Sequence, residues 1–321
     1  MEGLIVYGIF FLTLVGIYGL LALGLNVQWG YSGMLNIGVA AFFAVGAYSS
    51  AILTTGWSDN HIGGLGLPVA AGFIFAMLVS GVLAFLIGLI TLNLRSDYLA
   101  IASIGIAEIV RLVLKNEGWM TGGVRGLGQI PRPTAGMAPD WLAALVPAPN
   151  QFLYMLIVLA LVLIAYWANE RVWRAPWGRV MRAIRDNEAA ARAMGKKALV
   201  FRVQAFTFGS MIMGLAGAAY AHFLGFISPE AFEPLYATFL VWVMLIAGGS
   251  GNNRGAILGA FVIWVVWSGS ETFINRLPED IVTRASALRV LLIGVLLQVV
   301  LLSRPQGILP ERPPRPISGK K

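Results

Sequence analysis

Two charged side chains inside an apolar stretch are the first candidates for chemistry. Glu108 and Arg111 stand three positions apart within residues 98–114, a stretch with no other charged residue. Residues at this spacing lie on one side of a helix, so the carboxylate and the guanidinium are predicted to form an ion pair. A self-neutralised pair in apolar surroundings favours a role in packing, and contact with a polar solute is the alternative.

A basic, alanine-rich segment is the second candidate. Residues 169–202 hold nine Arg or Lys against three acidic residues. From Arg182 to Met194 nearly every residue favours a helix, and Glu188 precedes Arg192 by four positions, the spacing of a favourable ion pair. Gly195 is predicted to end this helix, because glycine adopts the left-handed turn that closes a helix at little cost.

The small side chains of this helix indicate how it would be used. Its alanines offer little apolar area to bury in a bilayer, and they permit close approach of another protein. A docking helix is therefore favoured over one that lies on anionic lipid, and nucleic-acid binding, another use of a basic patch, is not expected. The residues with this expected docking role are Arg182, Arg185, Glu188, Ala189, Ala190, Ala191 and Gly195.

Motifs for catalysis, metals and nucleotides are missing from the sequence. It has no cysteine, and its two histidines, His61 and His222, fall in expected loops. It also lacks the Gly-x-x-x-x-Gly-Lys-Ser/Thr loop that cradles phosphates, the Gly-x-Ser-x-Gly elbow and the His-Glu-x-x-His zinc motif. We expect no catalytic residues, no metal site, no cofactor and no enzyme activity in the chain itself.

The composition indicates the kind of secondary structure that positions these residues. Of 321 residues 58% are apolar and 12% charged, whereas soluble domains carry about 25% charged residues. Uncharged runs long enough to cross a bilayer predict an all-α, polytopic membrane protein with about eight to ten transmembrane helices. The first run lacks the basic front of a signal peptide, so it is interpreted as a retained helix. The nine runs are 4–25, 34–55, 67–94, 98–114, 152–168, 199–222, 235–247, 256–274 and 287–303.

The distribution of charge predicts the orientation. Residues 1–303 are expected to form one transmembrane domain that includes a cytoplasmic loop, 169–198, and residues 304–321 a basic cytoplasmic tail. Segments rich in Lys and Arg stay in the cytoplasm, because their translocation is disfavoured. The long connection 115–150 would then face outward.

Two stretches interrupt the pattern of straight helices. Residues 26–48 and 214–234 mix Gly, Ser, Asn or Pro into apolar surroundings. Such stretches form broken helices that line a cavity in transporters, and close packing of small residues is the equally weighted alternative. Asn36, in the first stretch, is a candidate for a translocation path together with Glu108 and Arg111. The Gly-x-x-x-Gly spacing of 255–259 predicts contact with a neighbouring helix.

Several of these motifs, in the same order, resemble one protein family. The segment PWGRVMRAIRDNEAAARAMG (176–195) resembles the cytoplasmic coupling segment of permease subunits in bacterial ATP-binding-cassette (ABC) importers for branched-chain amino acids. The resemblance covers nearly the whole chain. It also rests on GMLNIGVAAFFAVGAYSSA (33–51), DYLAIASIGIAEIVRLVL (97–114), TGG (121–123), GLAGAAYAHFLGFISPEAF (214–232), GGSGNNRGAILGA (248–260) and RPQGIL (304–309).

The resemblance implies an importer of the bacterial inner membrane. Two homologous permeases would form the pore, two cytoplasmic ATP-binding subunits would drive it, and a periplasmic solute-binding protein would deliver the solute. This chain resembles the second of the two permeases, and residues 188–195 would lie in a cleft of the ATPase. Asn36 departs from the family's more usual serine, and Asn252–Arg254 from its small or aromatic residues.

Three other functions are alternatives to this one. Permeases for urea and short amides share most of the motifs. An ion-coupled secondary transporter also uses broken helices, but it needs membrane-embedded acids, and here Glu108 is the one acid clearly within a span. A membrane-bound enzyme ranks third, because no catalytic set was found.

Overall fold

The computed structural model describes residues 2–57, 62–92, 96–274, 291 and 294–311. Within these residues the chain is built of helices, with one isolated antiparallel bridge between Leu127 and Ile227. The first half contains α1 (Glu2–Gln28), α2 (Val39–Thr54), α3 (Val69–Thr91), α4 (Ser96–Asn116), α5 (Gly118–Thr121), η1 (Gly123–Arg125) and α6 (Asp140–Leu145). The second half contains α7 (Pro149–Arg174), α8 (Pro176–Asp186), α9 (Glu188–Ala193), α10 (Ala198–Leu224), η2 (Pro229–Phe232), η3 (Leu235–Phe239), α11 (Leu240–Gly248) and α12 (Asn253–Ile274).

The predicted all-α, multi-pass fold is confirmed. Within the described part of the chain, five helices are long and apolar enough to cross a membrane: Glu2–Gln28, Val69–Thr91, Pro149–Arg174, Ala198–Leu224 and Asn253–Thr272. Shorter apolar helices are Val39–Thr54, Tyr236–Gly248 and Gly294–Ser303. At about 1.5 Å per residue, α3 is long enough for a hydrocarbon core of about 30 Å.

Other predicted segments are described in part. The predicted span 98–114 lies within α4, which is helical but also carries Asp97 and Lys115 near its ends. The predicted last span is described only from 294 to 303, apart from Leu291, and these ten residues form an apolar helix. His61 and residues 312–321 of the expected tail lie outside the described residues.

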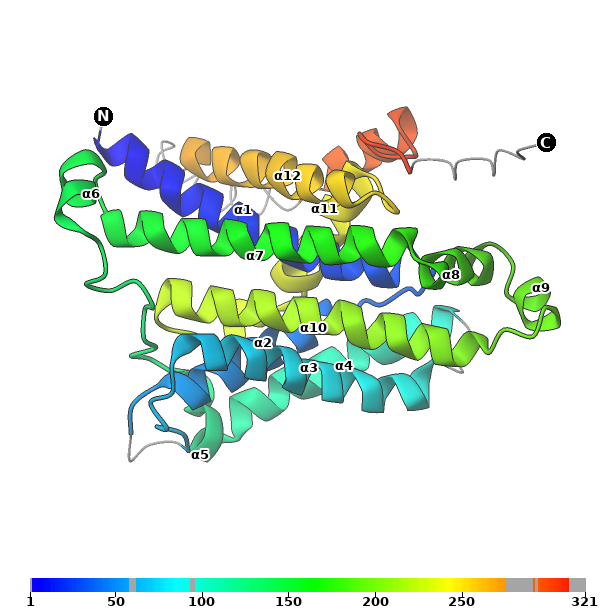
Figure 1. Ribbon diagram of the computed structural model, residues 1–321, viewed down its shortest axis with the longest axis horizontal. Coiled ribbons are helices and arrows are strands. Elements are labelled where there is room, and N and C mark those ends of the chain that lie inside the picture. The colour runs from blue at the N-terminus through cyan, green and yellow to red at the C-terminus, as the bar shows by residue number, and fades with distance from the viewer. Residues whose placement is uncertain (1, 58–61, 93–95, 275–290, 292–293, 312–321) are drawn as a thin grey trace.

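The long helices run side by side along the length of the molecule (Figure 1). α10 lies centrally and packs against α1, α2 and α3, while α1 also contacts α7 and α12. The short helices α5 and α6 lie at one end of the bundle and α8 and α9 at the other (Figure 1). We call these the α6 end and the α8 end. The basic segment (169–202) and the connection 115–150 therefore lie at opposite ends of the bundle.

The helices at the centre of the bundle pack closely against one another at glycine residues. A Cβ atom added to Gly214 of α10 would lie 2.2 Å from Ser80 Oγ of α3, and one added to Gly217 would lie 2.0 Å from the Phe43 carbonyl oxygen of α2. Residues 214–224 lie without a break in α10. Small-residue packing explains the glycines of this part, and the predicted interruption of 214–234 follows it, because α10 ends at Leu224 and residues 225–228 are non-helical.

The first predicted break is present. α1 ends at Gln28, residues 33–38 are non-helical, and α2 begins at Val39. The predicted contact of 255–259 is also present, because Cβ atoms on Gly255 and Gly259 would lie 2.7 and 1.9 Å from carbonyl oxygens of α11. These glycines let α11 and α12 pack backbone to backbone.

Candidate functional site

The basic segment folds as two short helices. The prediction of one helix from Arg182 to Met194 is wrong, because Asn187 has an extended backbone, with φ −156° and ψ 98°. Its Oδ1 accepts a hydrogen bond from the backbone N–H of Ala190 at 3.0 Å, so Asn187 caps a new helix, α9. Asparagine favours this role because its short side chain reaches the free N–H groups of a first turn. Arg192 consequently shares no helix face with Arg182 and Arg185.

One face of α8 and α9 is buried against the bundle. Met181, Ile184 and Ala191 are buried, and Ile184 and Ala191 form a small core with Ala198 at the start of α10. Ala191 therefore differs from Ala189 and Ala190, which are exposed. Because Ala191 is buried, another protein could not contact its side chain. A sequence of consecutive alanines gives no indication of which of them points inward.

The other face is exposed. Ala189, Ala190 and Gly195 are exposed, and Met194 has 80% of its surface accessible. Gly195 has φ +75°, the left-handed conformation expected of a residue that ends a helix. Ala189, Ala190 and Gly195 have little or no side chain, so a partner could approach the backbone closely at these positions.

Ion pairs hold this exposed face in place. Glu188 contacts Arg192 at 2.5 Å, as its spacing predicts, and also contacts Arg202 of α10 at 2.6 Å. The guanidinium of Arg182 lies 4.1 Å from the ring centre of Trp173, at the end of α7. α9 is thus tied to α10, and α8 is tied to α7.

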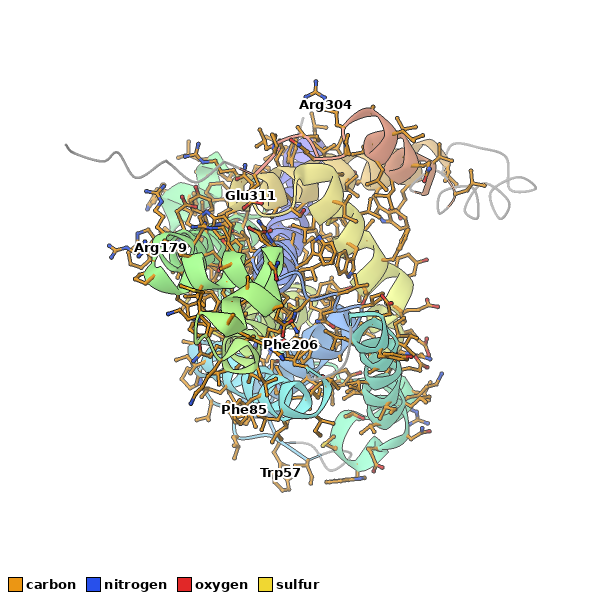
Figure 2. All side chains as sticks on the ribbon, turned by 90° about the vertical axis from the view of Figure 1, so that its right-hand side faces the viewer. Trp57, Phe85, Arg179, Phe206, Arg304 and Glu311 are labelled. Atoms are coloured by element: carbon orange, nitrogen blue, oxygen red, sulfur yellow. The ribbon has the colours of Figure 1, made fainter. Side chains whose placement is uncertain are left out.

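Arg185 points into the bundle. Its guanidinium donates to the carbonyl oxygen of Gly30 and contacts the Glu311 carboxylate at 3.0 Å. Figure 2, which looks onto the α8 end, shows Glu311 beside α8. Arg185 therefore does not belong to the exposed face, although the sequence predicted a docking role for it.

Asn36 lies in a buried polar network. Its Nδ2 donates to Gln28 Oε1 at 2.7 Å, its Oδ1 accepts from the backbone N–H of Gly38 at 2.8 Å, and its carbonyl oxygen accepts from Trp242 Nε1 at 2.9 Å. Gln28 in turn donates to Ser210 of α10. The side chain of Asn36 thus fixes the course of 33–38 between α1 and α2.

Glu108 and Arg111 form the predicted pair, with an N–O distance of 2.6 Å. The pair extends to η2, because Glu230 lies 3.5 Å from Arg111 and 2.9 Å from Lys115. The Lys115 ammonium lowers the pKa of the Glu230 carboxyl. The sequence analysis missed Glu230, which is remote in the chain. Side-chain exposures of 39% for Glu108 and 55% for Glu230 leave carboxylate surface open on this side of α4.

His222 is not in a loop, contrary to the sequence analysis. It lies in the last turn of α10 and is buried, with Nε2 2.9 Å from Ser50 Oγ and Nδ1 2.8 Å from the Pro131 carbonyl oxygen. Both ring nitrogens have partners, so its role is structural. Among the described residues, no group of three or more metal-ligating side chains lies together.

The described residues thus form a multi-pass helical membrane protein with an exposed face of small residues at its basic end. Comparison with known proteins gives the family: a model described as branched-chain amino acid transport system / permease component matches residues 8–301. The chain belongs to this family.

Three relatives show how far the similarity extends. The high-affinity branched-chain amino acid transport system permease protein LivM of Escherichia coli (strain K12) is 34% identical over 94% of this chain and 70% of its own length. The probable branched-chain amino acid transport permease protein LivM of Methanocaldococcus jannaschii is 28% identical over 93% of this chain and 92% of its own. The permease protein LivH of Salmonella typhimurium is 25% identical over 92% of each chain. No solved structure matches the chain.

Proposed function

We propose that the chain is a transmembrane permease subunit of an ATP-driven ABC importer and forms half of a translocation pathway for branched-chain or related hydrophobic amino acids. The match of the family model across residues 8–301 carries this proposal. The names of relatives 34% and 28% identical to the chain support the choice of solute. A homologous second permease, two ATP-binding subunits and a periplasmic binding protein would complete the importer.

The exposed face of α9 is proposed as the contact with an ATPase subunit. The sequence lacks a phosphate-cradling loop of its own, so energy from ATP hydrolysis would enter through contact. Ala189, Ala190 and Gly195 would lie against the ATPase, and Glu188 would hold them in position through Arg192 and Arg202. The concentration of Lys and Arg in residues 169–202 supports a cytoplasmic α8 end in the bacterial inner membrane.

The exposed charges beside α4 are proposed to line the translocation path. A carboxylate open to hydrocarbon is costly, so Glu108 is expected to face either a solute path or the second permease. Arg111 and Lys115 supply positive charge on the same side, and together these groups suit a zwitterion. Asn36 would act indirectly, by shaping the segment between α1 and α2.

Reconstitution tests this function. The chain would be purified with its second permease and ATPases, placed in proteoliposomes with its binding protein, and supplied with ATP. We expect ATP-dependent uptake of labelled leucine, isoleucine or valine. Uptake of urea or acetamide in place of these amino acids would assign the alternative solute class, and uptake by this chain alone, driven by an ion gradient, would overturn the importer.

A further inference from the structure

The segment 304–311, here called the C-terminal strap, is bound to the turn between α11 and α12. The backbone N–H groups of Ile308 and Leu309 donate to the carbonyl oxygens of Ala247 and Gly248, each at 2.9 Å. Asn252 Nδ2 donates to the carbonyl oxygens of Leu309 and Pro310 at 3.3 and 3.1 Å. The strap therefore holds the α11–α12 turn by contacts along its length.

Two glycines let the strap approach this closely. A Cβ atom on Gly249 would lie 2.2 Å from the Leu309 carbonyl oxygen, and one on Gly307 would lie 2.5 Å from Gly249 Cα. Both glycines have positive φ angles, +116° and +77°. Backbone meets backbone here, so the strap and the turn are expected to move as one body.

Arg185 joins this body to the basic segment and to the end of α1. Its guanidinium lies 3.0 Å from Glu311, the last described residue of the strap, and also binds the Gly30 carbonyl oxygen. Its side chain is 24% exposed, so water screens these contacts weakly. Arg185 thus connects α8, the strap and the segment that leads from α1 to α2.

The end of α1 and the 29–38 segment are also joined directly to the α11–α12 turn and the start of α12. The Gly251 N–H of the α11–α12 turn donates to Asn26 Oδ1 of α1 at 2.8 Å, and Tyr31 Oη donates to Asn253 Oδ1 at 2.7 Å. A displacement of α8 would therefore reach both the 29–38 segment and the α11–α12 turn through one side chain. The exposed face of α9 has no comparable connection to these elements among the contacts of the described residues.

We propose that Arg185 is a positioning residue that transmits movement of α8 to the 29–38 segment and, through Glu311 and the strap, to the α11–α12 turn. This inference rests on the proposed function, since it assumes that an ATPase subunit moves α8 and α9. In this proposal Arg185 acts through Gly30 and Glu311 and not by direct contact with the ATPase or the solute. Glu311 serves as its counter-ion beside the neighbouring Asp186, which lies 3.3 Å from Arg185 Nε, and gives the strap a role in coupling.

The test compares Arg185→Gln, Arg185→Lys and Glu311→Gln in the full complex. Glu311→Gln weakens the link to the strap but keeps the Gly30 contact, Arg185→Gln loses both, and Arg185→Lys keeps the charge without the forked guanidinium. Arg174→Gln is the matched control, because Arg174 forms an ion pair with Glu170 at the same end of the bundle but is 71% exposed. The readout is amino acid taken up per ATP hydrolysed, with assembly and Tm measured in parallel.

We expect Arg185→Gln to lower uptake per ATP about tenfold, a typical coupling effect, with Arg185→Lys and Glu311→Gln intermediate and Arg174→Gln unchanged. An unchanged ratio in the three variants would overturn the inference and leave the importer intact. If Arg185→Gln fails to assemble, Arg185→Lys and Glu311→Gln decide. A parental complex without ATP-dependent uptake would refute the proposed function instead. In that case hydrogen exchange still tests the link: faster exchange of the Ile308 and Leu309 amides in Glu311→Gln supports it, and unchanged exchange refutes it.

Discussion

Asn187 accepts a hydrogen bond from the backbone N–H of Ala190 at 3.0 Å and thereby divides the basic segment into two helices. A single continuous helix would place Arg182, Arg185 and Arg192 near one face. The break instead turns α9 so that Ala191 packs inward while Ala189 and Ala190 stay exposed. One amide side chain therefore decides which alanines a partner can contact.

Replacing Asn187 with Ala removes this cap. The loss of an asparagine cap costs about 1 kcal/mol of helix stability, so the amides of α9 should exchange faster with solvent while the long helices keep their protection. Hydrogen exchange of the purified chain measures this. Asn187→Asp, which retains a capping oxygen, should exchange like the parent, and faster exchange in Asp as well as Ala would contradict the capping role.

Enlarging Ala190 should uncouple the importer. Ala190→Trp places a bulky side chain on the exposed face, so the chain should fold and yet lower ATP-dependent uptake about tenfold, as expected when a coupling contact is disturbed. Ala143→Trp is the matched control: it alters an exposed alanine in a short helix, α6, at the other end of the bundle. Parental uptake by Ala190→Trp would exclude α9 as the coupling element.

Enlarging Ala191 should have a different effect. Ala191 is buried against Ile184 and Ala198, so Ala191→Trp overpacks this core, at a cost of about 1–3 kcal/mol. We expect α9 to detach from α10 even without an ATPase present, which limited proteolysis between residues 186 and 198 would detect. Equal protease resistance in Ala190→Trp and Ala191→Trp would show that the two alanines do not differ in burial.

The ion pairs beside α4 predict unequal effects of single replacements. Arg111 lies between Glu108 and Glu230, so Arg111→Gln leaves two carboxylates with less positive charge, whereas Glu108→Gln leaves Arg111 with Glu230. An unpaired charge within a membrane helix costs about 3 kcal/mol on insertion scales. Assembly yield should therefore fall most in Arg111→Gln and recover in part in the double variant Glu108→Gln/Arg111→Gln. Additive losses in the double variant would show that the two residues do not act as a pair.

Single-cysteine labelling tests the proposed orientation. The chain has no cysteine of its own, so no background has to be removed. A cysteine replacing Ala190 should react with a membrane-impermeant maleimide only after the membrane is opened. A cysteine replacing Trp141, exposed on α6 at the other end, should react in cells whose inner membrane is intact. The reverse pattern would invert the topology.

The sequence was sufficient for features that depend on local spacing. Apolar runs predicted most of the helices, three-residue spacing predicted the Glu108–Arg111 pair, and Gly255 and Gly259 predicted a close helix contact. The prediction failed where a side chain finds its partner elsewhere in the chain. His222, in the last turn of α10, can be buried because Ser50 and Pro131 provide hydrogen-bond partners for both of its ring nitrogens. Neither residue is near it in sequence.

The same reason explains the errors within the basic segment. Helix propensity is summed over a window, and one capping asparagine does not alter that sum, so the break at Asn187 was missed. The inward direction of Arg185 depends on Gly30 and Glu311, which reach it from two other parts of the chain. No pattern within residues 182–197 contains that information.

The backbone N–H groups of Ile37, Gly38 and Ala40 donate to side-chain oxygens rather than to a regular ladder of main-chain carbonyls. The N–H of Ile37 donates to Ser103 Oγ at 2.9 Å, and the N–H of Ala40 donates to Thr238 Oγ1 at 3.0 Å. Hydrogen bonds within a sheet or helix join main-chain groups, so they accept almost any residue. The hydrogen bonds of Ile37 and Ala40 instead need a hydroxyl side chain at two fixed positions on other helices. Ser103 and Thr238 should consequently tolerate exchange between serine and threonine while rejecting alanine and valine, so during divergence of the sequence the path between α1 and α2 is constrained by two buried positions on other helices.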